Sequence, residues 1–355
     1  MTIHNYRKTF SVLKLFEKFI RDMRKGKRLQ PNGRRISPGA IENYTYTLLV
    51  LKKFCISRGF YLRLYTISKM SGVELIKERN YWRIFYKKFA DYMYMDCNYF
   101  DNYVGSIIKK VRAFFNYLNK EMVLGIGEFH KSFYARSEEI PVITLQPGQL
   151  QFLISNTDFE NSLPRRLKKC KDIFVFGCTV GLRFGDLMDV RLKDLEWVNG
   201  SCYLSARSKK TDIPTKIKLP RYAVNIITST TRFKRPYERI FTSISLAQFN
   251  RNLRALAEKA AWIQEIGKQR SREGKNIEIT RYGSNKSYRF CDLLSSHVMR
   301  RTAITTMLML GMQQDVVRKI SGHTANSKSF FRYVNYAQPY LDQEIDKFHD
   351  RFQEP

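Results

Sequence analysis

The chain has 355 residues, of which 43% are hydrophobic and 14% aromatic, enough apolar material to bury a core in each of two ordinary domains. Lysine and arginine outnumber aspartate and glutamate by 63 to 32, giving a formal net charge of +31 that is spread along the chain. This composition excludes a disordered chain. Its positive surplus predicts a polyanionic partner, most simply nucleic acid.

The cysteines and the apolar segments argue against two further classes of protein. The six cysteines are scattered, with no CxxC pair and no His/Cys cluster at metal-ligand spacing, so we expect buried thiols and no metal. No run of about 18 apolar residues occurs, and the start MTIHNYRKTF lacks an apolar core with a cleavage site. We expect a soluble cytoplasmic protein that does not enter a membrane.

Helical periodicity runs from Lys8 to about Lys120. Two apolar faces mark the first two helices, namely Leu13, Phe16, Ile20 and Met23, and then Ile41, Tyr44, Leu48, Leu51 and Cys55. Ser37 is placed to cap the second helix, with Pro38 at its first position. A third helix is predicted through WRIFYKKFADYMYM, and a fourth has the stripe Val104, Ile107, Val111, Phe114 and Leu118. These helices predict an all-α domain that ends near Ile140.

Beyond that boundary the pattern includes a short region of β structure. KDIFVFGCTVGLRFGDLMDVRLKDL predicts a buried helix, a break at Gly181 and a second helix from about Phe184. SCYLSARSKKTDIPTKIKLP predicts a β-hairpin with KKTD at its turn. Helices resume with SLAQFNRNLRALAEKAAW, and residues 267–289 read as a long surface loop. We predict a mainly α protein with a small β-hairpin or sheet, divided into domains 1–140 and 141–355.

Residues 295–336 bring together side chains suited to phosphate chemistry. His297 and Arg300 lie one turn apart, so both project from the same helix face. A second helix, QQDVVRKIS, ends at Gly322, which suits a left-handed C-cap, with His323 just past it and Tyr333 ten residues farther on. Taken singly, each residue is more often structural or solvent-facing than catalytic. Only their combination indicates a site.

GLRFGDL, a hairpin lysine, SSHVMRRT, SGHT and then a tyrosine, in this order, resemble the signature of the tyrosine recombinases, the phage integrase family. The resemblance covers about Leu145 to Tyr336. It implies a two-domain DNA clamp, in which the helical front domain takes the place of the family's SAM-like core DNA-binding domain. The doubled arginine and FNRNLRALAEKAAW look most like mobile-element integrases of the Bacteroidetes, which implies a bacterial, nucleoid-associated protein.

The resemblance also implies a nucleophile and a phosphate clamp. By its place after SGHT, Tyr333 matches the family's nucleophile, which would form a covalent 3′-phosphotyrosine without metal, ATP or other cofactor. The spacing from His323 is one residue longer than is usual in the family, which leaves Tyr336 as the alternative. Arg183 and Arg300 match the arginines whose planar forks hold the scissile phosphate.

The remaining matched positions concern protons and orientation. His297 and His323 would lie beside the same phosphate, donating hydrogen bonds and managing the tyrosine proton. The family's general acid is a hairpin lysine, and RSKKTD offers Lys210, with Lys209 as the alternative. Asp186, one turn after Arg183, matches an acidic position that orients its neighbours.

The family works on double-stranded DNA as a homo-oligomer, so the resemblance implies a dimer at each recombination site and a tetramer in synapsis, which exchanges strands through a Holliday junction. Accessory DNA-bending proteins are possible partners. The stripe Leu341, Ile345, Phe348 and Phe352 predicts a terminal helix that either packs on its own core or docks in trans on a neighbouring protomer. Two other functions stay open: a type IB topoisomerase, and a non-catalytic DNA-binding regulator of the same fold.

Overall fold

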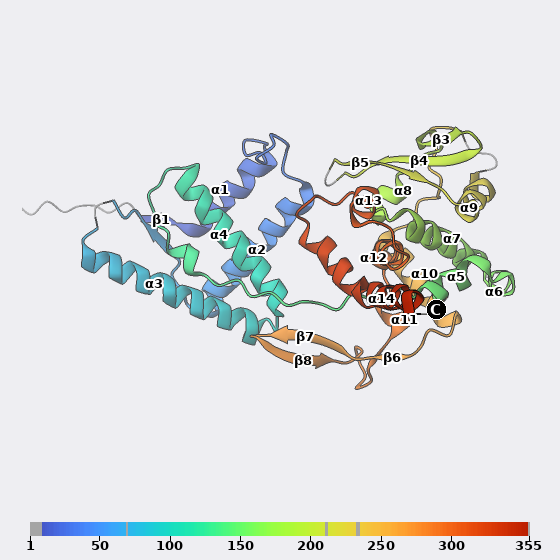
Figure 1. Cartoon of the computed structure of the whole chain (residues 1–355). Coiled ribbons are helices and arrows are strands. Elements are labelled where there is room, and N and C mark those ends of the chain that lie inside the picture. The colour runs from blue at the N-terminus through green and yellow to red at the C-terminus, as the bar shows by residue number, and fades with distance from the viewer. Residues whose placement is uncertain (1–8, 69, 210–211, 232–234, 354–355) are drawn as a thin grey trace, which may run out of the picture. The chain divides into compact units, whose positions relative to one another are not determined.

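The computed structural model describes residues 9–68, 70–209, 212–231 and 235–353 (Figure 1). The chain falls into two compact units. The first unit runs to Ile140 and also contains Gln269–Ile279, whereas the second contains Pro141–Lys268 and the chain from Thr280 onward. Both units are mainly helical with small sheets, which confirms the predicted fold class.

Long helices with aromatic interiors build the first unit. Its main elements are α1 (Val12–Arg24), α2 (Pro38–Ser57), α3 (Gly72–Asp91) and α4 (Asp101–Lys120). Its minor elements are the antiparallel strands β1 (Thr9–Ser11) and β2 (Arg63–Tyr65), a π-helical turn over Tyr92–Asp96 and a 3-10 turn over Phe129–Ser132. The Ser37 hydroxyl accepts the Ala40 N–H at 3.3 Å, and Pro38 opens α2, so the predicted cap is confirmed.

The predicted apolar stripes lie in the core of the first unit. On α4, every member of the predicted stripe is buried, and on α1 Phe16, Ile20 and Met23 are buried together with Phe19. The rings of Phe16 and Phe114 lie 4.4 Å apart between centroids, which joins α1 to α4. Burial of such a one-sided face, more than local propensity, stabilises helices of this length.

The prediction of a long loop over residues 267–289 is wrong. The segment contains strands β7 (Lys268–Arg272), β8 (Lys275–Ile279) and β9 (Tyr288–Arg289). Strand β7 pairs with β8, and β9 pairs with β6 (Glu265–Ile266), which lies just before the segment. Strand β7 escapes prediction because all of its residues are polar, and in β8 only Ile277 and Ile279 alternate with polar residues, which is too short a pattern to mark a strand.

Two buried carboxylates hold the β7–β8 hairpin in the first unit. Asp101, the first residue of α4, accepts hydrogen bonds from the hydroxyls of Tyr94 (2.7 Å) and Ser271 (2.6 Å) and from the N–H groups of Glu273 (2.8 Å) and Gly274 (3.0 Å). Glu138 accepts from the guanidinium of Arg270 at 2.7 Å. The hairpin therefore satisfies groups that the first 140 residues leave buried.

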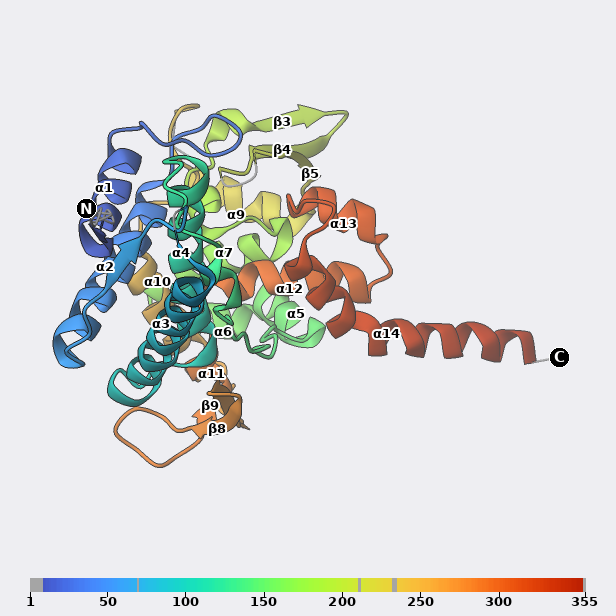
Figure 2. The same ribbon diagram turned by 90° about the vertical axis from the view of Figure 1, so that its left-hand side faces the viewer.

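Helices around a three-stranded sheet build the second unit. Its helices are α5 (Pro147–Ser155), α6 (Thr157–Ser162), α7 (Arg165–Val180), α8 (Phe184–Met188), α9 (Arg221–Thr231), α10 (Leu246–Lys259), α11 (Phe290–Leu293), α12 (Ser296–Met309), α13 (Gln314–Ile320) and α14 (Lys328–Gln353). The predicted hairpin is confirmed as β4 (Ser201–Arg207) and β5 (Pro214–Lys218), to which β3 (Leu195–Val198) adds an antiparallel strand. Figure 2 shows the C-terminal half of α14 extending away from the rest of this unit.

Helix α7 forms the centre of the second unit and sets the position of α12. It is buried on most sides, and α12 packs directly against it. A Cβ at Gly177 would lie 2.5 Å from the Met299 sulfur, so the glycine allows the two helices to approach closely. The helix ends at Gly181, which confirms the predicted break, and α8 then begins at Phe184 as predicted. The φ of Gly181 is +65°, in the left-handed region.

No helix in the described part of the chain is long and apolar enough to cross a bilayer. Of the stripe predicted on the terminal helix, Ile345 is exposed, while the side chains of Leu341, Phe348 and Phe352 lie outside the described residues. Whether this helix docks in trans stays a prediction.

Candidate functional site

Arg183 follows directly on the end of α7. The left-handed turn at Gly181 reverses the chain, Leu182 is buried, and Arg183 takes the N-cap position of α8. Its Nη1 donates to the hydroxyl of Ser208 at 2.7 Å, and Ser208 is itself buried where β4 ends. The loop after α7 and the turn of the β4–β5 hairpin thus hold one guanidinium between them.

Arg300 projects from α12 into the same region and is only 3% exposed. Its Nη1 donates to the carbonyl of Gly181 at 2.9 Å, and its Nη2 lies 3.1 Å from each ring nitrogen of His323. Burial, and next the charge of Arg183, lower the pKa of Arg300 to about 10, so it stays charged at neutral pH.

Within the described part of the chain, neither Arg183 nor Arg300 forms an ion pair with a carboxylate. A buried or half-buried cation without a counter-charge is costly, and an anion that binds between two such groups relieves the cost. The two guanidinium groups therefore form a candidate anion site.

Both predicted histidines lie in the field of these arginines. Burial, followed by the charges of Arg300, Arg183 and His297, lowers the pKa of His323 to about 3. His297 is exposed at the start of α12. Partial desolvation there, and then the charges of Arg301, Arg300 and Arg183, lower its pKa from the ordinary value. Both rings are therefore neutral at pH 7.

The two tyrosines have different surroundings on α14. Tyr333 is 5% exposed, and its ring meets the His323 ring edge to face, with centroids 6.1 Å apart. The hydroxyl of Tyr336 instead accepts a hydrogen bond from Thr144 Oγ1 at 3.2 Å. Tyr333 is thus the tyrosine that lies against the histidine.

The turn of the β4–β5 hairpin is tied to α8 by two aspartates. Asp186 Oδ1 accepts the backbone N–H of Lys209 at 3.3 Å. The Lys209 ammonium pairs with the carboxylate of Asp189, which also accepts from Arg239 at 2.6 Å. The hydrogen bond from Lys209 is the main cause that lowers the pKa of Asp189. Lys210 lies outside the described residues.

The sequence did not indicate several groups that position these side chains, namely Ser208, Asp189, Ser321 and the carbonyl of Gly181. Both serines lie next to predicted residues, in RSKKTD and SGHT, and that proximity is the only signal they carried. Gly322 has a φ of +60°, so the predicted left-handed C-cap of α13 before His323 is confirmed.

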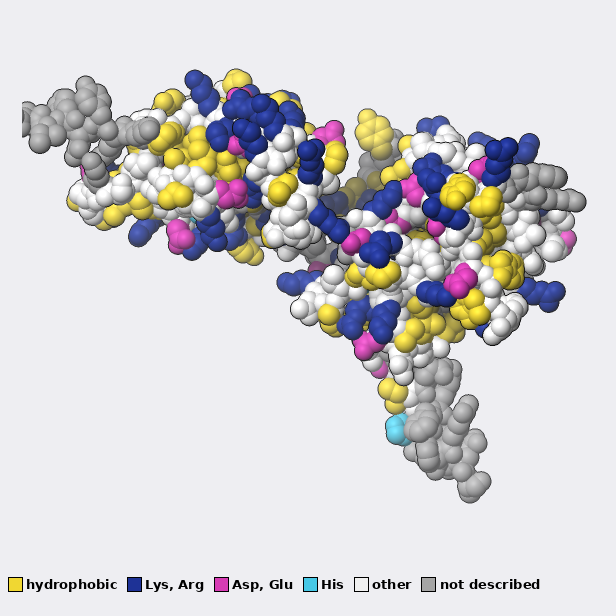
Figure 3. Space-filling view, turned by 90° about the horizontal axis from the view of Figure 1, so that it is seen from above, with side chains coloured by type: hydrophobic (Ala, Val, Ile, Leu, Met, Phe, Trp, Pro, Cys, Tyr) yellow, Lys and Arg dark blue, Asp and Glu magenta, His cyan; other side chains and the backbone are white. Residues whose placement is uncertain are grey.

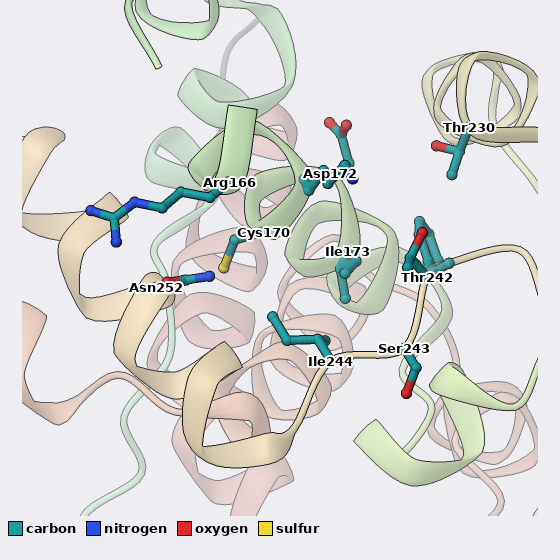
Figure 4. A pocket seen from close by; sticks show the side chains of 11 residues that line it. Arg166, Cys170, Asp172, Ile173, Thr230, Thr242, Ser243, Ile244 and Asn252 are labelled. Atoms are coloured by element: carbon teal, nitrogen blue, oxygen red, sulfur yellow. The ribbon is translucent and has the colours of Figure 1, made fainter. Parts of the chain in front are cut away.

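The predicted site residues do not line the half-open pocket of the second unit that Figure 4 shows. That cavity has a volume of about 210 Å³ and is bounded by α7, α10 and the segments around residues 230 and 241–244, including Arg166, Cys170, Asp172 and Asn252. The candidate site is therefore separate from this pocket.

Comparison with known proteins gives the family. The sequence model described as the phage integrase family matches residues 144–338, more than half of the chain. No curated protein matches the sequence.

Several solved structures share the fold of this chain although their sequence identity to it is low. The XerH site-specific recombinase, in a post-cleavage complex with palindromic difH substrate, is 12% identical with a TM-score of 0.56, covering 95% of this chain and 85% of that one. A lambda integrase dimer bound to a COC′ core site is 11% identical with a TM-score of 0.57, covering 92% and 77%. The Tn1549 transposon integrase in complex with transposon right end DNA is 13% identical with a TM-score of 0.57, covering 95% and 99%. The chain belongs to the phage integrase family, the tyrosine recombinases.

Proposed function

We propose that the protein cleaves and rejoins duplex DNA at specific sites through a covalent 3′-phosphotyrosine at Tyr333, with no metal or ATP. One observation carries the proposal: within the described residues, Arg183 and Arg300 have no carboxylate partner, and Tyr333 lies against a histidine that Arg300 contacts. Two fixed guanidinium forks suit the non-bridging oxygens of a phosphodiester.

In the proposed step, the Tyr333 oxygen attacks phosphorus while the bond from phosphorus to the 5′-oxygen breaks. The phenol proton passes to a histidine, for which the neutral rings of His297 and His323 are competent at pH 7. The departing 5′-oxygen takes a proton from the hairpin lysine. Because the phosphotyrosine retains the energy of the broken bond, attack by another 5′-hydroxyl restores DNA without ATP.

We assign the general acid to Lys210. Support comes from its neighbour: the Lys209 ammonium is paired with the Asp189 carboxylate, which disfavours the loss of its proton. Asp186 takes a positioning role, since its carboxylate accepts the backbone N–H of the residue before Lys210.

The proposed partner is double-stranded DNA, bound by residues 1–140 as a core-binding domain and by residues 141–355 as the catalytic domain. Figure 3 shows Lys and Arg side chains distributed over both units on the face displayed, in line with the charge of +31. We propose a dimer per site and a tetramer in synapsis in the bacterial nucleoid. The doubled arginine, Arg300 and Arg301, favours a mobile-element integrase of the Bacteroidetes type.

The test is a DNA suicide substrate, nicked beside candidate crossover sites taken from the flanking element. Covalent protein–DNA adduct is measured on a denaturing gel for wild type, Tyr333→Phe and the matched variant Tyr336→Phe. We expect adduct with wild type and Tyr336→Phe and none with Tyr333→Phe, because only the Tyr333 oxygen forms the ester.

Each of the other results would indicate a different nucleophile or a different function. Adduct lost only in Tyr336→Phe moves the nucleophile to that residue. Relaxation of supercoiled plasmid by monomeric protein, without strand exchange between sites, indicates a type IB topoisomerase. Specific DNA binding with no adduct in any variant indicates a non-catalytic regulator.

A further inference from the structure

Ser321 lies buried beside the histidine that contacts Arg300. It follows α13 directly and is 2% exposed. Its Oγ lies 2.8 Å from His323 Nδ1, and the same hydroxyl donates to the carbonyl of Val317 at 2.7 Å. The left-handed turn at Gly322 brings the serine and histidine side chains, two residues apart, to the same side of the chain.

The hydrogen bonds of Ser321 favour one arrangement of the protons in this group. A serine hydroxyl has a single proton, and here the proton goes to the Val317 carbonyl. Ser321 Oγ can then only accept from Nδ1, so Nδ1 carries the ring proton. Arg300 Nη2, 3.1 Å from both ring nitrogens, can only donate, and Nε2 is the nitrogen left with a lone pair to accept.

The contact with Arg300 does not separate the two tautomers, because Nη2 lies 3.1 Å from each ring nitrogen. The contact with Ser321 does. With the proton on Nε2, the Ser321 hydroxyl would have to leave the Val317 carbonyl in order to donate to Nδ1, which would forfeit a hydrogen bond made in a buried place.

We propose that Ser321 is a positioning residue that fixes His323 in its Nδ1–H tautomer and thereby presents the Nε2 lone pair to the site. The inference rests on the proposed function and deepens it, because it assigns the direction of proton flow. When a phosphate engages the Arg300 fork, Nε2 becomes available to take the Tyr333 proton: the phenol O–H bond breaks, an Nε2–H bond forms, and the ring becomes an imidazolium. Ser321 accepts from Nδ1–H throughout.

The first readout measures the tautomer without DNA. The full chain is labelled with ¹⁵N-histidine, and two-bond ¹H–¹⁵N correlations are recorded near neutral pH, with the His323 signals assigned by their loss in His323→Gln. We expect a protonated Nδ1 and an unprotonated Nε2 in wild type. Ser321→Ala should shift His323 toward the Nε2–H form, and Ser321→Thr, which keeps the hydroxyl, should restore the wild-type pattern.

The matched control is Ser155→Ala. Ser155 also ends a helix of the second unit and donates to the carbonyl four residues earlier, at 2.9 Å, with no histidine beside it. It should leave the His323 pattern unchanged. Far-UV circular dichroism and the unfolding temperature show which variants fold. An Nε2–H pattern in wild type, or an unchanged Nδ1–H pattern in folded Ser321→Ala, overturns the inference.

The second readout is the rate of adduct formation on the suicide substrate. Ser321→Ala should slow it by about tenfold or more at unchanged DNA affinity, with rescue by Ser321→Thr, since a misplaced proton acceptor affects the chemical step. An equal rate in folded Ser321→Ala overturns the catalytic part. If wild type forms no adduct while its tautomer is as expected, the proposed function fails and the structural role of Ser321 stands.

Discussion

The guanidinium of Arg300 shows how one residue is specified by groups far apart in sequence. Its partners are a backbone carbonyl at residue 181 and a histidine at residue 323, and 119 residues separate it from the first of these. Every residue has a backbone carbonyl, whatever its side chain, so no sequence motif can indicate which carbonyl accepts the hydrogen bond. Such a contact follows from the packing of α12 on α7.

Arg300→Lys tests the planar fork at constant charge. A lysine ammonium cannot reach the Gly181 carbonyl and two phosphate oxygens together, so adduct formation should slow by about 100-fold to 1000-fold. DNA affinity, measured by fluorescence anisotropy, should change little because the charge remains.

Arg254→Lys is the control for this change. Arg254 also donates to a backbone carbonyl, that of Leu294, at 3.4 Å, but it lies on α10, a helix that carries none of the candidate site residues. A comparable loss of rate in this variant would mean that any arginine-to-lysine change perturbs the unit, and the special role of Arg300 would have to be given up.

At this scale, the ordered motifs predicted residues that the structure does bring together, namely Arg183, His297, Arg300, His323 and Tyr333. Their roles stay predictions. The serines at 208 and 321 could not be predicted, because a serine beside a motif residue becomes a partner only if the backbone turns its hydroxyl inward, as the φ of +60° at Gly322 does for Ser321.

At the scale of elements, the periodicity of apolar residues was enough to predict those helices that bury one face. The stripe on α4 and the cap of α2 were readable because each depends on residues within a few positions. The β7–β8 hairpin was not readable, because its partners Asp101 and Glu138 lie more than 130 residues earlier in the chain.

The contact between α7 and α12 gives a prediction about packing. Gly177→Ala places a methyl group 2.5 Å from the Met299 sulfur and 3.1 Å from the Leu187 side chain. We expect overpacking to lower the free energy of unfolding by about 1 to 3 kcal/mol, measured by urea denaturation. Gly148→Ala, in open space on α5, should be neutral or slightly stabilising, and equal losses in both variants would contradict the packing argument.

The anchor of the β7–β8 hairpin gives a second prediction at this scale. Asp101→Ala leaves two hydroxyls and two backbone N–H groups without their acceptor. The free energy of unfolding at pH 7 should fall by about 2 to 4 kcal/mol, measured by urea denaturation followed with a probe in the first unit. Glu128→Ala, which removes one half of an exposed ion pair with Lys131, is the control and should have little effect.

Because Asp101 carries a titratable carboxylate, the difference in the free energy of unfolding between wild type and Asp101→Ala should depend on pH. Burial raises the pKa of Asp101, but hydrogen bonds from Ser271, Tyr94 and the Gly274 and Glu273 amides outweigh it and leave the pKa below 3.8. A depressed pKa contributes stability that is present above the unfolded value and is lost as pH falls through the folded value. The difference should therefore shrink below about pH 4, and a constant difference would mean that the charge of Asp101 is unimportant.

At the scale of the whole molecule, the net charge of +31 predicts how DNA binding responds to salt. Each neutralised phosphate releases counterions, so the logarithm of the affinity should fall linearly with the logarithm of salt concentration. For about six to ten phosphate contacts, affinity should fall by about 10³-fold to 10⁵-fold between 50 and 200 mM salt, measured by anisotropy. A nearly flat dependence would contradict a basic DNA-binding surface. Arg254→Lys, which conserves charge, should keep the wild-type slope.

The β7–β8 hairpin also affects the order in which the protein can be made. Because Gln269–Ile279 belongs to the first unit, that unit is discontinuous in sequence. A ribosome that has released residue 140 has supplied Asp101, Glu138 and the Tyr94 hydroxyl that donates to Asp101, but the other donors to these carboxylates arrive only with Arg270 to Gly274. The front unit is therefore completed late in synthesis, after most of the second unit has emerged, and a fusion joined at a single point near residue 140 would transplant it without one of its own parts.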